Sequence, residues 1–290
     1  MECNLNPSLL ASANGADVYC GDWRDLLMTG IEWDTLITDT PYSAKTHSGH
    51  AAGVSTSESM RAWAERESSG STARDRTYRL RKAAKGIAHR RKLEYSHWTP
   101  EDVDAFVVAW SPRIRGWFCS ITDDVLAPAW QASLKAAGRY AFAPLPLVVR
   151  GATVRQTGDG PSSWTSYLVV ARWSTPEMLR WGTLDGAYVL PPGQKRDLPV
   201  VGGKQPWIMQ RIVEDYSRPG DMIIDPCCGA GTTLVAAIRA TGGPRRAVGG
   251  DVDSAHAAFA AQWIANPYRE APGLPSAPTT GQVTLFGGNA

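Results

Sequence analysis

Residues 223–237 of this 290-residue chain read IIDPCCGAGTTLVAA, and this stretch decides the fold. Its apolar start predicts a buried strand that ends in Asp225. Gly229 and Gly231 then allow the backbone to turn tightly and to approach a ligand closely. The two threonines that follow begin a helix whose first amides point toward the same place. In open α/β sheets the crevice beyond such a strand end is where ligands bind.

The Gly-rich turn lacks the signature of a nucleoside-triphosphate site. No lysine follows Gly231, as a phosphate-binding loop of the GxxxxGK[ST] type requires, so ATP and GTP are disfavoured. The dinucleotide fingerprint GxGxxG is absent as well. The next predicted strand, residues 246–253, ends in acids, and Asp251 is where a carboxylate can accept both hydroxyls of a ribose. We therefore expect a cofactor that carries a ribose, with a plain tight turn as the alternative.

Strand-like and helix-like segments alternate through the rest of the chain. The predicted strands are residues 16–22, 33–39, 116–122, 143–150, 166–173, 222–225 and 246–253. The predicted helices are residues 99–114, 123–138, 205–217, 233–242 and 254–266. Residues 174–203 contain PPG and VVGGKQP and are expected to be irregular. Such alternation is typical of a parallel sheet with helices on both faces.

The composition is that of an ordinary globular protein, with 43% hydrophobic and 20% charged residues. A chain of this length can form one large α/β domain or two small ones. No apolar run approaches the ~20 residues of a membrane span, and the N-terminus has no secretory pattern, so we expect a cytoplasmic protein. The five cysteines include no CxxC pair, which favours reduced thiols and argues against a zinc site.

Positive charge gathers in residues 61–95, which hold eleven Lys and Arg against four acidic residues. The whole chain carries a net charge of only +2, so the remainder is slightly acidic. A basic segment on an acidic body favours a polyanionic partner such as nucleic acid, the alternative being a solvated helix face. Residues 43–72 are rich in Ser, Gly, Ala and Thr and predict a mobile loop.

A second polar stretch, ITDTPYS at residues 37–43, ends another predicted strand. An acid, a proline and an aromatic ring in succession make a poor core. They suit the rim of a site, because they supply a carboxylate, a stiff turn with exposed carbonyls and a flat stacking face. Thr40 is compatible with such a turn, since a residue before proline is pushed toward an extended conformation.

Several motifs together resemble the β-class of S-adenosylmethionine-dependent DNA amino-methyltransferases. DPCCGAGTT resembles the DPFxGxGTT cofactor motif of that family, and DTPY resembles its (D/N/S)PP(Y/F) catalytic motif. Family-like segments around them are VYCGDWRDLL, GGKQPWIMQRIVEDYSRPGDMIIDP and AVGGDVD. The catalytic motif precedes the cofactor motif, which is the order found in the β-class. The resemblance spans residues 17–265, interrupted by an insertion.

The resemblance implies an α/β, Rossmann-like methyltransferase fold, circularly permuted, whose mostly parallel sheet contains one antiparallel strand. It places the catalytic domain at residues 1–266, with a basic insertion at 43–98 and a disordered tail at 267–290. S-adenosylmethionine is the implied cofactor, and no metal is required. The residues that the resemblance assigns to cofactor binding are Asp22, Lys204, Pro206, Asp225, Pro226, Cys227, Gly229, Gly231, Thr232, Thr233 and Asp251.

The same resemblance implies that Asp39, Thr40, Pro41 and Tyr42 form the catalytic turn. The exocyclic amino group of a base is weakly nucleophilic, because its lone pair is delocalised into the ring. Asp39 and a main-chain carbonyl of the turn can each accept one amino hydrogen, which favours a pyramidal nitrogen. Tyr42 offers a stacking face worth about 1–3 kcal/mol. Catalysis is then mostly positioning and electrostatics, and a base in a duplex must first leave the stack.

The chain departs from the family pattern at three places. Thr40 stands where the family has its first proline, Gln205 lies inside the Lys-Pro pair, and Cys227 and Cys228 replace the customary Phe and its neighbour. An acid like Asp39 accompanies adenine more often in the family, so we expect methylation at adenine N6, with cytosine N4 as the alternative. The alternative of another class, motivated by Thr40, is an inactive DNA-binding protein on a methyltransferase fold.

We expect the basic insertion to contact double-stranded DNA. Its cations would neutralise phosphates and make affinity strongly salt-dependent. A disordered basic loop that only adds affinity is the alternative. The residues expected to bind DNA are Arg74, Arg76, Arg79, Arg81, Lys82, Lys85, Arg90, Arg91 and Lys92.

The tail contains the sequence QVTLF. Its Gln282, Leu285 and Phe286 resemble the QL(S/D)LF pentapeptide with which bacterial proteins bind the replication sliding clamp. Such tethering would raise the effective concentration of the protein at newly replicated DNA. The alternative is that the apolar residues fold back on the domain. The remaining expectations are a nucleoid-associated protein of bacterial or phage type, with oligomerisation and a partner restriction nuclease left open.

Overall fold

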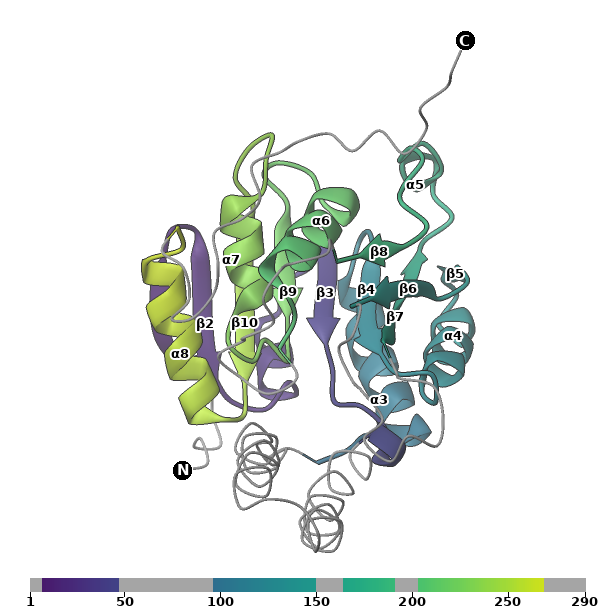
Figure 1. Cartoon of the computed structure of the whole chain (residues 1–290), viewed down its shortest axis with the longest axis horizontal. Helices are drawn as coiled ribbons and strands as arrows, with labels where there is room; N and C mark the ends of the chain where they lie inside the picture. Colours follow the sequence, from purple (N-terminus) through teal and green to yellow (C-terminus); the bar gives the residue numbers. More distant parts are fainter. Residues whose placement is uncertain (1–6, 47–95, 150–163, 191–202, 269–290) are drawn as a thin grey trace, which may run out of the picture.

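The computed structural model describes residues 7–46, 96–149, 164–190 and 203–268 (Figure 1). Within these ranges the chain forms one sheet with helices on both faces. The strand order is β1-β2-β10-β9-β3-β4-β7-β6-β8, and β5 pairs with β7. The predicted α/β fold is therefore confirmed.

Five neighbouring strands at the centre of the sheet are parallel: β2 (Ala16–Cys20), β10 (Arg246–Asp251), β9 (Met222–Asp225), β3 (Thr35–Asp39) and β4 (Phe118–Thr122). The predicted antiparallel strand is β7, which pairs with β4, and three shorter strands extend the sheet beyond it. The bounds of these outer strands are β7 (Thr165–Arg172), β6 (Leu145–Val148), β5 (Tyr140–Ala141) and β8 (Tyr188–Val189).

The sheet lies between two apolar layers, because successive side chains of its central strands point to opposite faces. Ile37 and Ile223 pack in one layer, while their neighbours Leu36 and Ile224 pack in the other. The first layer is covered by α6 (Pro206–Tyr216), α7 (Thr232–Arg239) and α8 (Ser254–Ala265). The second is covered by α3 (Pro100–Trp110) and α4 (Ala127–Ala136).

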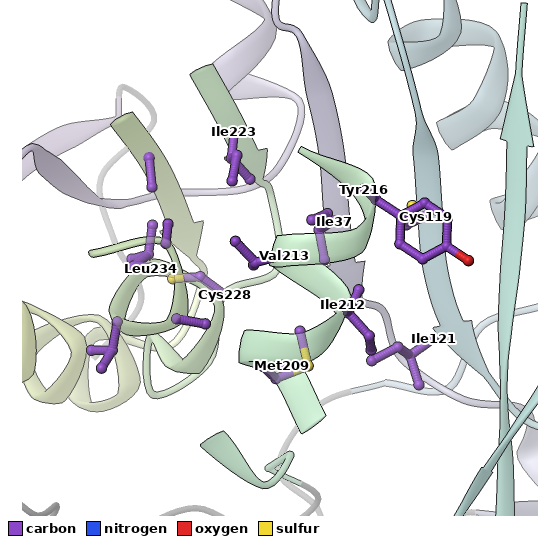
Figure 2. Close-up of a cluster of buried hydrophobic side chains, with 14 of the residues drawn as sticks. Ile37, Cys119, Ile121, Met209, Ile212, Val213, Tyr216, Ile223, Cys228 and Leu234 are labelled. Carbon is purple, nitrogen blue, oxygen red and sulfur yellow. The ribbon is translucent and has the colours of Figure 1, made fainter. Parts of the chain in front are cut away.

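Figure 2 shows part of the first layer, in which Ile212 of α6 meets Ile121 of β4, and Met209 of α6 and Ile37 of β3 belong to the same cluster. All four side chains are at most 1% exposed. The apolar face of α6 therefore fixes the start of this helix above the carboxyl ends of β3 and β4. That placement matters because Lys204 and Gln205 lie directly before α6.

The sequence predicted the start of α3 from its capping residues. The Thr99 side chain accepts a hydrogen bond from the Asp102 amide, and the Asp102 carboxylate accepts one from the Thr99 amide. Pro100 occupies the first turn, where its missing amide hydrogen costs nothing. This reciprocal arrangement satisfies two amides at the helix start and confirms the prediction.

Three elements differ from the sequence prediction. Strand β1 (Ser8–Ala13), an antiparallel edge strand beside β2, was not expected, because its exposed side chains show no alternation. Helix α4 begins at Ala127 instead of residue 123, since the Asp123 carboxylate accepts the amides of Val125 and Leu126 and forms a turn there. The stretch predicted to be irregular contains α5 (Pro176–Leu179) as well as β8.

The cysteines follow the prediction of reduced thiols only in part. Cys119, Cys227 and Cys228 are free, whereas Cys20 is disulfide-bonded. Among the described residues no cluster of His, Cys, Asp and Glu is arranged to hold a metal ion. No helix within the same ranges has the length and apolar character needed to cross a membrane.

Candidate active site

Four carboxylates lie in a row along one edge of the sheet. Asp39, Asp225 and Asp251 end β3, β9 and β10, and Asp22 follows the end of β2. Because these strands are parallel and adjacent in the order β2-β10-β9-β3, their carboxyl ends meet at the same edge. With about 4.8 Å between neighbouring strands, the row is about 14 Å long.

The row lies at the point where the chain connections diverge. From β3 the chain continues to β4 on one side, and from β9 it continues to β10 on the other. Such a divergence leaves a crevice outside the carboxyl ends of the strands, where ligands of α/β proteins bind. The order of the strands therefore creates this crevice between the two motifs that the sequence singled out.

A cavity of about 650 Å³ occupies this crevice. It is lined by all four residues of the predicted catalytic turn and by nine of the eleven residues assigned to the cofactor. The predicted residues in the lining are Asp39, Thr40, Pro41, Tyr42, Asp22, Lys204, Asp225, Pro226, Cys227, Gly229, Thr232, Thr233 and Asp251. Pro206 and Gly231 are not part of it.

Pro206 and Gly231 have structural roles. Pro206 occupies the first turn of α6. Gly231 has a φ of 81°, and a Cβ atom there would lie 2.8 Å from the Cβ of Ala260 in α8. The glycine thus permits both the left-handed turn and the close approach of α7 to α8. Their assignment to the cofactor stays a prediction.

Asp251 organises the Gly-rich turn through hydrogen bonds from the backbone. The Gly229 amide donates to its Oδ2 at 2.8 Å, and the Asp253 amide donates to its Oδ1 at 2.9 Å. His256 Nδ1 lies 3.7 Å from the same Oδ1. The carboxylate is therefore fixed at the edge of the cavity, where it can still accept hydrogen bonds from hydroxyl groups of a ligand.

Asp225 is the most deeply buried carboxyl group of the row, with 1% of its surface exposed. The Cys227 amide donates to its Oδ1 at 3.2 Å. Burial raises the pKa of Asp225 to about 7 despite hydrogen bonds that lower it. Burial also raises the pKa of the Cys227 thiol well above its usual value. Cys227 is therefore protonated at neutral pH and unsuited to nucleophilic attack.

The catalytic turn is held by Lys204. Its Nζ donates to Asp39 Oδ2 at 2.6 Å and lies 5.0 Å from the centre of the Tyr42 ring. The Tyr42 hydroxyl donates to the other oxygen, Asp39 Oδ1, at 3.2 Å. Burial raises the pKa of Asp39, and the charge and hydrogen bond of Lys204 oppose that rise. Lys204 thus lines the cavity and contacts the catalytic motif, whereas the resemblance assigned it to the cofactor.

Thr40 is buried, and its hydroxyl lies 3.3 Å from the hydroxyl of Ser120 on β4. The two side chains form a hydrogen bond between the turn and the neighbouring strand. A proline at position 40 could not make this contact. This departure from the family pattern therefore comes with a polar partner of its own.

Asp123, at the end of β4, is a site residue that the sequence analysis missed. Its Oδ2 accepts hydrogen bonds from the Ser43 amide, the Ser43 hydroxyl and the Thr46 hydroxyl at 3.0, 2.5 and 2.6 Å. Its Oδ1 accepts the two amides before α4. Burial raises the pKa of Asp123, but these hydrogen bonds outweigh burial, so the pKa is lower than usual. An acid directly after a predicted strand was the only available signal.

Aromatic residues around the cavity were missed as well. Trp98 and Trp23 line it, and both rings contact Phe106 of α3, with ring centres 5.3 and 5.1 Å apart. The Trp98 amide donates to the Tyr42 carbonyl at 3.0 Å, and Trp98 forms a parallel bridge with Ser43. These contacts join residue 98 to the catalytic turn. Sequence patterns do not reveal them, because more than fifty residues separate the partners.

The predicted DNA-contacting residues between Arg74 and Lys92 lie outside the described residues, as do Gln282, Leu285 and Phe286 of the tail. Most of the basic insertion predicted at 43–98 and nearly all of the tail predicted at 267–290 also lie outside the described residues. These assignments stay predictions.

The chain resembles DNA methylases both in a segment of its sequence and in its fold. Residues 204–261 match the family model described as DNA methylase, N6_N4_Mtase. No curated protein matches the chain in sequence.

Solved structures resemble the chain over most of its length. M1.HpyAVI in complex with SAM has a TM-score of 0.52 and 14% identity, covering 85% of this chain and 98% of that one. A putative DNA modification methylase from Thermus thermophilus, complexed with S-adenosyl-L-methionine, has a TM-score of 0.51 and 16% identity, with 86% and 92% covered. The PvuII DNA methyltransferase, described as cytosine-N4-specific, has a TM-score of 0.55 and 10% identity, with 89% and 88% covered.

At these identities the structural likeness shows the fold alone, and the family match covers the segment that contains the cofactor motif. The two findings are independent of each other. Both agree with the resemblance that the sequence motifs indicated. Residues 204–261 therefore resemble the DNA methylase family in sequence, and the described chain has the fold of the solved DNA methyltransferases.

Proposed function

We propose that this chain transfers the methyl group of S-adenosylmethionine to the N6 amino group of adenine in DNA. The observation that carries the proposal is the row of Asp22, Asp251, Asp225 and Asp39, which all line one cavity. Asp225 belongs to the cofactor motif and Asp39 to the catalytic motif. Such a row suits an extended cofactor whose reactive end lies beside the target amino group.

The chemistry of the cavity lining fits this cofactor. The fixed carboxylate of Asp251 is a suitable acceptor for ribose hydroxyls, and Asp22 is available for the adenine end. Thr232 and Thr233 bring the first amides of α7 to the cavity, where they suit a carboxylate. In this proposal Asp225 faces the ammonium group of the cofactor. S-adenosylmethionine, when bound, supplies an electrophilic methyl group.

In this proposal Asp39 and a carbonyl of the Thr40–Pro41 turn accept the two hydrogens of the target amino group. Accepting both hydrogens favours a pyramidal nitrogen, whose lone pair is then directed at the methyl group. Tyr42 contributes a stacking face for the base, worth about 1–3 kcal/mol. The reaction needs positioning and electrostatic stabilisation more than acid–base chemistry.

The preference for adenine over cytosine rests on Asp39, since an acid at this position accompanies adenine more often in the family. The test is methyl transfer from labelled S-adenosylmethionine to unmethylated genomic DNA, followed by mass spectrometry of the nucleosides. We expect 6-methyladenine. A signal of 4-methylcytosine would overturn the assignment of the base while keeping the reaction class.

A second candidate is a DNA-binding protein that has lost catalysis. It was motivated by Thr40, but the hydrogen bond between Thr40 and Ser120 and the contacts of Asp39 support an intact turn. The same assay separates the two candidates. Measurable cofactor binding without any methylated base would favour the inactive protein.

Two further interactions are proposed from the sequence alone. We propose that the cations between residues 74 and 92 contact the DNA backbone, and that Gln282, Leu285 and Phe286 bind the sliding clamp. For the tail, a pull-down with purified clamp is the measurement. Replacement of Leu285 and Phe286 by Ala should remove binding, and absence of binding by the unaltered chain would refute the idea.

A further inference from the structure

Lys204 reaches the catalytic turn from a distant part of the chain. It lies 165 residues after Asp39 and directly before the first turn of α6. Its side chain is 15% exposed, and that of Asp39 is 23% exposed. A charge pair largely withdrawn from water interacts more strongly than a surface pair. The contact of 2.6 Å between Nζ and Oδ2 is the short distance typical of a charge-assisted hydrogen bond.

The two oxygens of Asp39 are held unequally. Oδ2 accepts the short hydrogen bond from Lys204, whereas Oδ1 accepts a longer one, of 3.2 Å, from the Tyr42 hydroxyl. The stronger contact fixes the rotation of the carboxylate about its Cβ–Cγ bond. Oδ1 is then the oxygen that can exchange its weaker partner for an amino hydrogen of a base.

The surroundings of Asp39 make its charge state depend on Lys204. Burial raises the pKa of this carboxyl group, while Lys204 and the Tyr42 hydroxyl lower it. The other acid facing it is Asp225 at the end of β9, and repulsion between the two carboxylates also opposes ionisation. Lys204, directly before α6, supplies the positive charge that favours the ionised form of Asp39.

We propose that Lys204 is a positioning residue for methyl transfer: it fixes one oxygen of Asp39 and keeps the carboxylate ionised, so that the other oxygen accepts an amino hydrogen of the target base. This inference rests on the proposed function. It differs from the role in cofactor binding that the family resemblance implied, because the contact that the structure shows is to the catalytic turn. The Lys204 side chain acts through Asp39 and needs no contact with the reacting atoms.

The test compares Lys204→Met with Lys204→Arg, which keeps the charge, and with Lys135→Met, which removes an exposed lysine of α4. Turnover at saturating cofactor and DNA is measured across pH, and cofactor affinity is measured separately by calorimetry. For Lys204→Met we expect kcat to fall about tenfold or more at pH 7 with cofactor affinity within about threefold of the unaltered chain. The acid limb of the pH profile should move up by about 1–3 pH units.

Lys204→Arg should restore most of the turnover and the original acid limb, and Lys135→Met should change neither. The double variant Asp39→Asn, Lys204→Met should have the same pH profile as Asp39→Asn alone, because the carboxylate at position 39 that Lys204 keeps ionised is then absent. Thermal melting of each variant shows whether it is folded. If Lys204→Met is unfolded, the comparison of Lys204→Arg and Lys204→Gln provides the same contrast.

A loss of cofactor affinity with unchanged kcat and unchanged pH profile would overturn the proposal and return Lys204 to cofactor binding. Unaltered turnover in Lys204→Met would overturn it as well. Failure of the proposed function has a different signature, since the unaltered chain would then bind the cofactor without methylating any base in DNA.

Discussion

The four carboxyl groups of the cavity differ in their surroundings, and these differences separate their roles. Asp39 has two polar partners, one of them a cation, whereas Asp225 is buried and is held by neutral hydrogen-bond donors. Asp251 accepts backbone amides. Substitution at each position should therefore affect a different property of the protein.

Replacing Asp39 by Ala should abolish methyl transfer and leave cofactor binding within about threefold. In the proposed reaction this side chain accepts a hydrogen of the target amino group, and it is separate from the Gly-rich turn. Labelled methyl transfer and calorimetry measure the two properties. Asp185→Ala, at an exposed carboxylate paired with Arg211, is the control and should change neither. Turnover of the Asp39→Ala variant at the unaltered rate would refute the assigned role.

Asp225 should make the cofactor-free protein less stable as pH rises. Its pKa is about 7 when folded, against a usual value of 3.8, so the folded state holds a proton that the unfolded state loses first. The contribution of this group to stability is therefore complete below about pH 4 and is lost as pH rises to about 7. At full ionisation the loss is at most about 4 kcal/mol.

Asp225→Asn removes this ionisation and should raise the melting temperature of the cofactor-free protein more at pH 8 than at pH 5. Cofactor affinity should fall at pH 8, since the proposed counter-charge for the ammonium is gone. Melting curves at the two pH values and calorimetry provide the data. An equal change in stability at both pH values would contradict the raised pKa.

At the scale of the elements, β4 supports the catalytic turn through Asp123, the residue that follows its end. Asp123 connects the start of α4 with Ser43 and Thr46, which follow Tyr42 closely. Asp123→Ala should lower the free energy of unfolding by about 2–4 kcal/mol, since it leaves several buried donors without partners. It should also lower kcat, with cofactor affinity unchanged.

Denaturant unfolding and turnover assays test this prediction, and Asp124→Ala is its matched control, because that neighbour is exposed and forms a surface ion pair with Lys45. The pH dependence adds a check. The folded pKa of Asp123 is lowered, so its contribution is present above the unfolded pKa and is lost as pH falls through the folded value. An unaltered turnover in Asp123→Ala would show that Ser43 is fixed by other contacts.

Patterns within one element were enough to predict most elements. The apolar runs of β9 and β10, the cap at Thr99 and the Gly-rich turn depend on residues close in sequence, and the structure agrees with them. The same patterns placed the two motifs at one edge of a parallel sheet. Strand β1 escaped prediction because an exposed edge strand needs no alternation.

The pairs that complete the site could not be predicted in this way. Lys204 meets Asp39 across 165 residues, and Ser43 meets Asp123 across 80. No periodicity relates such partners, since they are brought together by the order of the strands. The motif resemblance identified Lys204 as a site residue but attached it to the cofactor, because a motif names positions without giving contacts.

At the scale of the whole molecule, the uneven distribution of charge should govern DNA binding. Charge reversal at Arg79, Arg81 and Lys82 should weaken binding and flatten its dependence on salt. If each cation neutralises one phosphate, the slope of log K against log salt falls by about 0.9 for each phosphate that is no longer neutralised. Titration of a fluorescent duplex at several salt concentrations measures both effects.

The matched control reverses three exposed cations elsewhere, Lys135, Arg180 and Arg246, and so makes the same change in net charge. If binding depends on a localised contact surface, this control should weaken affinity much less. Equal effects of the two triple variants would show that only the overall charge matters.

The contact between Trp98 and the catalytic turn also bears on which part of the chain can change in sequence and length during evolution. The described chain leaves the turn at residue 46 and returns at residue 96, and both Thr46 and Ser96 line the cavity. The hydrogen bond from Trp98 to Tyr42 ties the two sides together independently of what lies between them. Closing a longer loop costs only about 0.6 kcal/mol for each doubling of its length. Evolution can therefore exchange or lengthen the intervening segment without changing the strand order that brings the residues of the cavity together.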